Sequence, residues 1–355
     1  MKSLFDPVSF GPLRLKNRIV RSATMAGATL AEKGAIWAEL AAGGSGLVIT
    51  GMMGVIENSC VGERMTQGYR PGVLEAHKPF FEAVQRHGAK IAVQLGHCGL
   101  KANFLDGGQR PLGPSVVRLP NQEAPLAMRH EQIAQVVAAF AKTARSCKEA
   151  GADAVQLHAA HGYLLSQFLS PFFNHRLDEY GGNIDNRGRI VLEIVEAIRG
   201  QVGPDYPVLI KVNYSDLAEP SITFEECASL CSQLAKHGLT AVELSAGLGN
   251  DALTSPIRRV KKPGEEGYFA EPALDLADML SIPVISVGGY RDIEAMEKRL
   301  NQGQIEAFAM SRPLICEPAL AARWQSGDRV RARCVSCNRC FSPKGAFGCK
   351  YPFPA

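Results

Sequence analysis

Short apolar runs, each the length of a β-strand, recur along the chain at fairly even intervals. They cover residues 18–23, 46–51, 90–95, 154–158, 208–213, 241–245, 283–287 and 305–309. Between most of them, apolar residues recur every three or four positions, which is typical of amphipathic helices, as in 131–150, 187–202, 223–237 and 292–301. Near-continuous apolar strands alternating with helices indicate a parallel sheet that is buried on both faces. Eight such units favour an α/β fold of the (β/α)8 TIM-barrel class.

Polar residues and glycines follow the carboxyl ends of these predicted strands, the rim where such barrels place their active sites. The candidates are Ala23, Thr24, Gly51, Gln94, His158, His161, Tyr163, Lys211, Gly288, Gly289, Ser311 and Arg312. Residues 1–17 precede the first strand, and we expect them to cover the opposite end of the barrel. Beyond Pro318 the strand character ends. We therefore expect a single domain over 1–355 with a Cys-rich tail at about 330–355.

The composition is that of an ordinary globular enzyme, with 355 residues, 46% hydrophobic and 21% charged. The formal net charge is +4, and Lys and Arg are scattered except in the cluster Arg258, Arg259, Lys261 and Lys262. We interpret that cluster as a solvated loop after a strand and expect no nucleic-acid partner.

The N-terminal residues contain no apolar secretory core, and no stretch approaches about 18 consecutive apolar residues. We therefore expect a cytoplasmic protein with no membrane partner. In that compartment the 10 cysteines are expected to be reduced thiols. The expected partner is a small-molecule substrate, and a homo-oligomer is compatible with the sequence.

His158, His161 and Tyr163 emerge together where the strand at 154–158 ends. A pair of imidazoles can bind a substrate oxygen while a nearby phenol delivers a proton. Two histidines three residues apart could instead bind zinc, as in a metal-dependent barrel hydrolase or lyase, but no acidic residue stands beside them and Tyr is an unusual ligand. A non-catalytic binding protein is a third interpretation, although it has no need of the phenol.

Several motifs occur in one order and spacing. They are Asn-Arg-Ile-Val at 17–20, Arg-Ser-Ala-Thr at 21–24, Gly-Gly-Ser-Gly-Leu-Val-Ile-Thr-Gly at 43–51, Gln-Leu-Gly-His at 94–97, the block 158–189, Val-Gly-Gly at 287–289 and Ser-Arg-Pro-Leu at 311–314. Together they resemble the old yellow enzyme family of FMN-dependent oxidoreductases, and more closely its branch related to the barrel domain of bacterial 2,4-dienoyl-CoA reductases. The resemblance extends over nearly the whole chain.

The resemblance implies an FMN across the carboxyl end of the barrel. Ala23, Thr24, Met25 and Gly51 would line its ring, Gln94 would bind the pyrimidine and Lys211 would face N1 and O2, where a cation stabilises the anionic reduced flavin. The phosphate would be held by Gly288, Gly289, Ser311 and Arg312. Met25 departs from well-studied relatives, which carry Thr or Cys beside flavin O4, and a thioether cannot donate a hydrogen bond.

The resemblance also implies a reaction, in which His158 and His161 bind the carbonyl oxygen of an α,β-unsaturated compound. Hydride from flavin N5 would add to the β-carbon while Tyr163 protonates the α-carbon, and NAD(P)H would reduce the same FMN. An oxidative demethylase or dehydrogenase of the same family is the alternative.

Four tail cysteines, Cys334, Cys337, Cys340 and Cys349, resemble the iron–sulfur ligands of dienoyl-CoA reductases. Their last two spacings are shorter than in those enzymes. We therefore favour free thiols over an iron–sulfur cluster or a zinc site.

Overall fold

A closed barrel of eight parallel strands forms the centre of the computed structural model, which describes residues 1–25, 29–62, 65–102, 110–119, 125–249, 254–341 and 347–353. Its strands are β3 (Ile19–Arg21), β4 (Leu47–Ile49), β6 (Lys90–Gly96), β9 (Ala154–Ala159), β10 (Val208–Asn213), β11 (Ala241–Ser245), β12 (Val284–Val287) and β13 (Ile305–Met310). The pairing of β4 with β6 closes the ring, and the short β5 (Met53–Gly54) pairs in parallel with the carboxyl end of β6. All eight predicted strands and the predicted fold class are confirmed.

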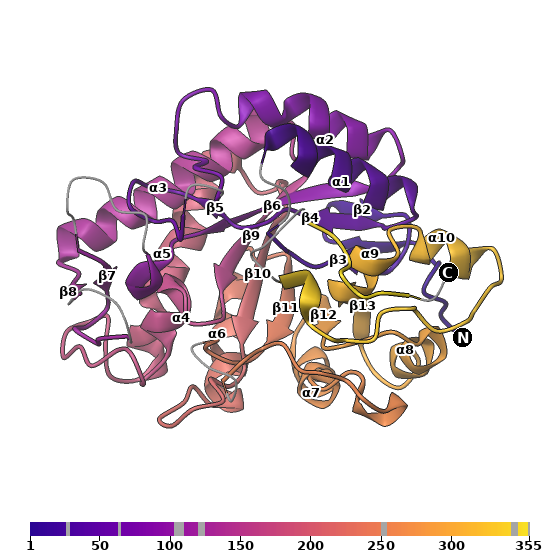
Figure 1. The fold of residues 1–355 in the computed structure, drawn as a ribbon. Helices are drawn as coiled ribbons and strands as arrows, with labels where there is room; N and C mark the ends of the chain where they lie inside the picture. Colours follow the sequence, from indigo (N-terminus) through magenta and orange to yellow (C-terminus); the bar gives the residue numbers. More distant parts are fainter. Residues whose placement is uncertain are drawn as a thin grey trace.

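Helices surround the barrel (Figure 1). They are α1 (Leu30–Ala42), α2 (Lys78–Gln85), α3 (His130–Glu149), α4 (Leu164–Leu169), α5 (Ile184–Val202), α6 (Phe224–Lys236), α7 (Ala270–Met279), α8 (Ile293–Leu300), α9 (Arg312–Cys316) and α10 (Leu320–Gln325). The four helices expected from the sequence correspond to α3, α5, α6 and α8. No helix in the described ranges is both long and apolar enough to span a bilayer.

The N-terminal hairpin closes one end of the barrel, as predicted. Strands β1 (Val8–Phe10) and β2 (Leu13–Leu15) pair antiparallel. Their buried side chains form one apolar cluster with residues inside the barrel, among them Leu209 and Ile285. A second small sheet, β7 (Leu112–Gly113) with β8 (Leu126–Ala127), lies in the long connection after β6.

The barrel interior changes from apolar to polar along the strands. In β9, Ala154 joins the apolar cluster next to the hairpin, whereas His158 lines a pocket at the other end. In β10, Leu209 and Lys211 show the same change. Because alternate residues of a strand face the same side, these positions all point inward, and the residues between them, such as Val155, pack outward. The polar layer therefore lies at the carboxyl ends of the strands.

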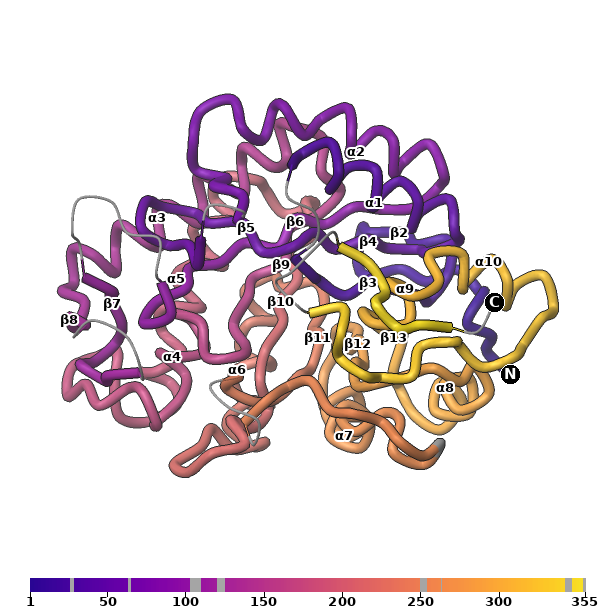
Figure 2. Tube along the Cα trace, in the orientation of Figure 1, coloured from indigo at the N-terminus to yellow at the C-terminus, as the bar shows by residue number. Residues whose placement is uncertain are grey.

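The C-terminal segment crosses this polar end. Figure 2 shows the yellow part of the chain next to β3 and β13. Ser336 and Phe341 from this segment line the same pocket as the barrel residues. Residues 342–346 and 354–355 of the predicted Cys-rich tail lie outside the described residues.

Candidate active site

A pocket at the carboxyl end of the barrel brings most of the predicted site residues together. Its lining includes Ala23, Thr24, Met25, Gln94, His158, His161, Tyr163, Lys211, Gly289, Ser311 and Arg312. Gly51 and Gly288 do not line it. Gly51 packs behind Met25, where a Cβ would come within 3.0 Å of the Met25 Cα. The carbonyl oxygen of Gly288 accepts hydrogen bonds from the backbone of Gly267 and Tyr268.

A left-handed turn after β9 brings the two histidines and the tyrosine together. His161 and Gly162 have φ values of 61° and 67°, a conformation that costs free energy for a residue with a Cβ. The turn reverses the chain, so that the His158 and His161 rings lie 5.2 Å apart and the His158 and Tyr163 rings 5.0 Å apart. Three groups that can donate or accept a hydrogen bond therefore meet in one part of the pocket.

Both imidazoles are held neutral. Burial, with the positive charges of Lys211 and Lys101, lowers the pKa of His158 and His161 well below the ordinary value. His161 Nε2 lies 2.8 Å from the hydroxyl of Ser245. His158 Nδ1 is buried and has no hydrogen-bond partner among the described residues. A buried polar atom without a partner is costly, so His158 can gain a hydrogen bond from a ligand in this pocket.

Lys101 is a site residue that the sequence pattern did not reveal. Its Nζ donates a hydrogen bond to the carbonyl oxygen of His161 at 2.8 Å and lies 5.3 Å from the centre of the Tyr163 ring. Burial lowers the pKa of Lys101 to about 8 and raises the pKa of the Tyr163 phenol. The cation holds the turn in place and favours negative charge near the phenol. In the sequence, Lys101 lies four residues after His97. That position gives no sign of a contact with His161, which lies 60 residues further along the chain.

A chain of buried hydrogen bonds connects Lys211 to Gln94 inside the barrel. Glu243 Oε1 lies 2.8 Å from Lys211 Nζ and accepts from Ser22 Oγ at 2.6 Å. Gln156 donates to the other Glu243 oxygen at 2.8 Å and accepts from Gln94, also at 2.8 Å. Burial alone would raise the pKa of Glu243, but Lys211 and the hydrogen bonds outweigh it and keep the pKa below its ordinary value.

Sequence reasoning missed Ser22, Gln156 and Glu243. A signal for Glu243 was present, because a carboxylate within an apolar strand must be paired if it is buried. Its partner follows from the barrel register, which places Lys211 beside Glu243.

The opposite end of the pocket carries a buried cation. The Arg312 guanidinium donates to the carbonyl oxygen of Arg258 and to Asn338 Oδ1, both at 2.7 Å. Neither acceptor is charged, and Arg312 pairs with no carboxylate among the described residues. Ser311 Oγ lies 2.8 Å from Thr24 Oγ1 nearby. Because a buried charge needs a counter-charge, this end fits a phosphate group.

Met25 lines the pocket at the end of β3 with 43% of its surface exposed. Tyr268 and Phe269 also form part of the pocket wall. The sequence indicated the loop that ends at Tyr268 as a pocket-shaping segment, but it singled out neither aromatic residue, because they show no distinctive pattern.

The four tail cysteines differ in burial. Cys334 is buried, Cys337 and Cys340 are intermediate, and Cys349 is exposed. A fifth cysteine, Cys316 at the end of α9, was missed in the sequence. Burial and the adjacent Cys349 thiol raise the pKa of Cys316 to about 12. The expectation of free thiols stays a prediction.

Within the described ranges, one group of three or more His, Cys, Asp or Glu side chains is close enough together to hold a metal ion. It consists of His130, Asp178 and Glu179. It does not include His158 or His161. Among the residues that the structure describes, no acidic ligand therefore groups with the pair in the pocket to complete a two-histidine, one-carboxylate zinc site.

The sequence and the structure were compared with those of known proteins. Residues 3–330 match the model of the NADH:flavin oxidoreductase / NADH oxidase family. The chain is 34% identical to a metal reductase of Desulforamulus reducens over 96% of its own length and 51% of that protein. It is 31% identical to a 4,4'-dithiodibutanoate disulfide reductase of Rhodococcus erythropolis, covering 95% of this chain and 92% of the relative.

Among solved structures, a complex of 2-naphthoyl-CoA reductase superimposes with a TM-score of 0.86 at 25% identity. The match covers 95% of this chain and 54% of that protein. The chain thus spans about half the length of the metal reductase and of the 2-naphthoyl-CoA reductase.

Proposed function

Because the chain belongs to the NADH:flavin oxidoreductase / NADH oxidase family, we propose that it is an FMN-dependent NAD(P)H oxidoreductase that reduces the C=C bond of α,β-unsaturated carbonyl compounds. Family membership confirms the resemblance to old yellow enzymes. The observation that carries the proposed reaction is the meeting of His158, His161 and Tyr163 in one pocket with Lys211.

The two histidines would bind the substrate carbonyl. Neutral imidazoles can donate hydrogen bonds to a carbonyl oxygen and stabilise the negative charge that develops on it. Bound FMN would supply a hydride to the β-carbon. Tyr163 would then deliver its phenolic proton to the α-carbon, and Lys101 above the ring would favour the phenolate that forms.

Two separate cations would hold the two ends of the FMN. Lys211 fits the ring end, because a positive charge there favours the reduced anionic flavin. Arg312 fits the phosphate end, since its buried guanidinium contacts only neutral acceptors within the described part of the chain. Gly289, Ser311 and Thr24 line the same pocket.

The test is a visible absorption spectrum of the purified protein, followed by anaerobic addition of NADPH or NADH and then 2-cyclohexenone. We expect the bands of oxidised flavin, bleaching by the nicotinamide and recovery with the enone. The double variant His158→Ala/His161→Ala should keep FMN but lose recovery with the enone and binding of phenolic ligands. A colourless protein that cannot be reconstituted with FMN would contradict the assignment and favour the metal-dependent alternative.

A further inference from the structure

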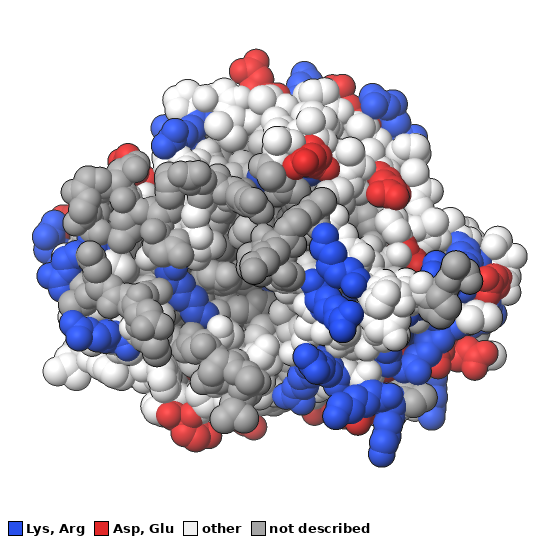
Figure 3. Space-filling view, viewed as in Figure 1, with Lys and Arg blue, Asp and Glu red and all other residues white. Residues whose placement is uncertain are grey.

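Two basic segments lie side by side next to the mouth of the pocket. The first carries Arg258, Arg259, Lys261 and Lys262, and the second carries Arg339; all five side chains are exposed, and we call them the basic strip. Figure 3 shows Lys and Arg gathered on the part of this face formed by the orange and yellow segments of Figure 1. The sequence alone suggested only a solvated loop here.

Two buried arginines fasten these segments to each other. Arg312 donates to the carbonyl oxygen of Arg258 and to the side chain of Asn338, both at 2.7 Å. Arg291 donates to the carbonyl oxygens of Val260 at 3.2 Å and Cys334 at 2.9 Å. Arg312 thus joins residue 258 to residue 338, and Arg291 joins residue 260 to residue 334. Because the numbers rise in one segment as they fall in the other, the two segments run antiparallel. The basic strip therefore lies on a fixed surface.

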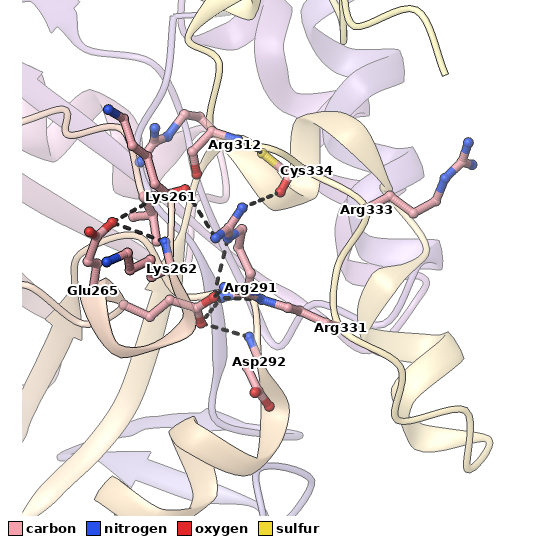
Figure 4. Close-up of polar contacts among 12 residues, drawn as sticks. Lys261, Lys262, Glu265, Arg291, Asp292, Arg312, Arg331, Arg333 and Cys334 are labelled. Carbon is pink, nitrogen blue, oxygen red and sulfur yellow. Dashed lines mark hydrogen bonds and ion pairs between the residues drawn. The ribbon is translucent and has the colours of Figure 1, made fainter. Parts of the chain in front are cut away.

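A buried carboxylate completes this support, and Figure 4 labels Arg291 and Arg331, the two arginines with which it pairs. Glu266 is 2% exposed, lies 3.3 Å from Arg291 and pairs with Arg331. The neighbouring Glu265 accepts hydrogen bonds from the backbone N–H groups of Lys261 and Lys262 at 2.6 and 3.1 Å. These two carboxylates hold the loop and the buried arginines, and the five cations of the strip outnumber them.

The strip continues directly into the pocket wall. Pro256 and Ile257, just before Arg258, line the pocket. The Arg258 guanidinium lies 5.3 Å from the centre of the Tyr268 ring and 5.4 Å from that of Phe269, and both rings are part of the wall. A ligand whose reactive end lies in the pocket can therefore extend over the strip.

We propose that the basic strip binds the phosphates of a substrate that carries a phosphorylated adenosine diphosphate and places its reactive end in the pocket. This inference rests on the proposed function. NADPH and coenzyme A thioesters share this chemistry, a pyrophosphate plus a ribose monophosphate. The monophosphate alone adds a charge of about −1.5 to −2 at pH 7. Like charges held close together repel each other, and a polyanion that bridges them removes that repulsion.

The test measures binding of 2′,5′-ADP, which represents NADPH, and 3′,5′-ADP, which represents coenzyme A, to the FMN-loaded protein by calorimetry. In the variant Lys261→Glu/Lys262→Glu we expect Kd to rise at least about tenfold, and in Lys261→Gln/Lys262→Gln to rise less. Added salt should weaken binding to the unmodified protein. The matched control is Arg333→Glu, because Arg333 is exposed nearby but points away from both lysines (Figure 4) and stacks on Phe353 at 4.4 Å. This control should leave Kd unchanged.

The outcomes distinguish NADPH from a coenzyme A thioester as the ligand of the strip. They also test the strip assignment separately from the proposed function. Tighter binding of 2′,5′-ADP assigns the strip to NADPH, and tighter binding of 3′,5′-ADP assigns it to a coenzyme A thioester. No binding at millimolar concentration, equal Kd in the variants, or the same loss in the Arg333→Glu control would overturn the inference. If the unmodified protein binds the probes but does not transfer electrons from NAD(P)H to the enone, the proposed function fails and the strip assignment stands.

Discussion

Glu243 is a fully buried carboxylate, and it pairs with the cation that we place beside the flavin ring. The negative charge of Glu243 partly cancels that of Lys211. Removing it in Glu243→Gln should leave the Lys211 charge uncompensated and stabilise the anionic reduced flavin. We expect the midpoint potential of bound FMN to rise by roughly 30 mV, equivalent to about 1.4 kcal/mol for a two-electron couple. Potentiometric titration against a reference dye measures this shift.

The control for this variant is Glu149→Gln, which removes an exposed carboxylate that pairs with Arg145 on α3. It should leave the potential unchanged. Since breaking a buried ion pair costs about 3–5 kcal/mol, thermal unfolding of both variants should show a loss of stability only in Glu243→Gln. An unchanged or lower potential in Glu243→Gln would mean that this carboxylate does not act on the flavin through Lys211.

In the proposed reaction, Tyr163 would contribute a phenolic proton, at a site where burial raises the pKa of the phenol. Tyr163→Phe should leave flavin reduction by NAD(P)H nearly intact and slow reoxidation by the enone roughly 10²–10⁴-fold, the usual contribution of a general acid. Stopped-flow measurements of the two half-reactions distinguish these effects. Equal losses in both half-reactions would show that the phenol acts through binding or structure and not as the proton donor.

At the scale of elements, the β1–β2 hairpin covers the end of the barrel that lies opposite the pocket and shields its apolar interior from water. Phe10 is fully buried in the apolar cluster inside the strands, whereas Arg14 on the same hairpin is exposed. Phe10→Ala should lower the free energy of unfolding by about 3–5 kcal/mol because it opens a cavity, and Arg14→Ala should change it little. Urea denaturation measures both, and similar losses in the two variants would contradict the packing role of the hairpin.

The elements that the sequence predicted are those whose pattern is local. All eight barrel strands are mostly apolar, and α3, α5, α6 and α8 show a clear three-to-four-residue period. The hairpin strands contain three residues each, and the middle residue of each strand is exposed, so they form no continuous apolar run. Helices α9 and α10 have 5 and 6 residues and fall below the length at which periodicity is informative.

Most of the site was predictable, because its residues follow the carboxyl ends of the predicted strands and these ends meet at one rim. His158, His161 and Tyr163 are joined by a single turn, so their proximity follows from the sequence. Lys101 and Glu243 reach the site through barrel closure, over separations of 60 residues to His161 and 32 to Lys211. No local pattern encodes those contacts. The basic loop was recognised as a cluster, but the buried arginines that fasten it come from elsewhere in the chain.

At the scale of the whole molecule, the proposed FMN site joins strands that are not neighbours in the barrel. His158 and Lys211 come from β9 and β10, whereas Ser311 and Arg312 follow β13. A ligand that contacts both ends binds the folded state and not the unfolded chain, and at 100 times its Kd it adds about 2.7 kcal/mol of stability. Thermal unfolding of the flavin-free protein with added FMN should therefore show a clear rise in Tm.

Riboflavin distinguishes the two ends, because it has the same ring as FMN but no phosphate. At equal concentration we expect it to raise Tm less than FMN does. In Arg312→Ala the two flavins should raise Tm by similar amounts, since the charge that favours the phosphate is gone. Arg333→Ala, an exposed arginine that stacks on Phe353, should keep the difference. If FMN and riboflavin stabilise the unmodified protein equally, the phosphate does not bind at Arg312, and the buried guanidinium requires a different anion.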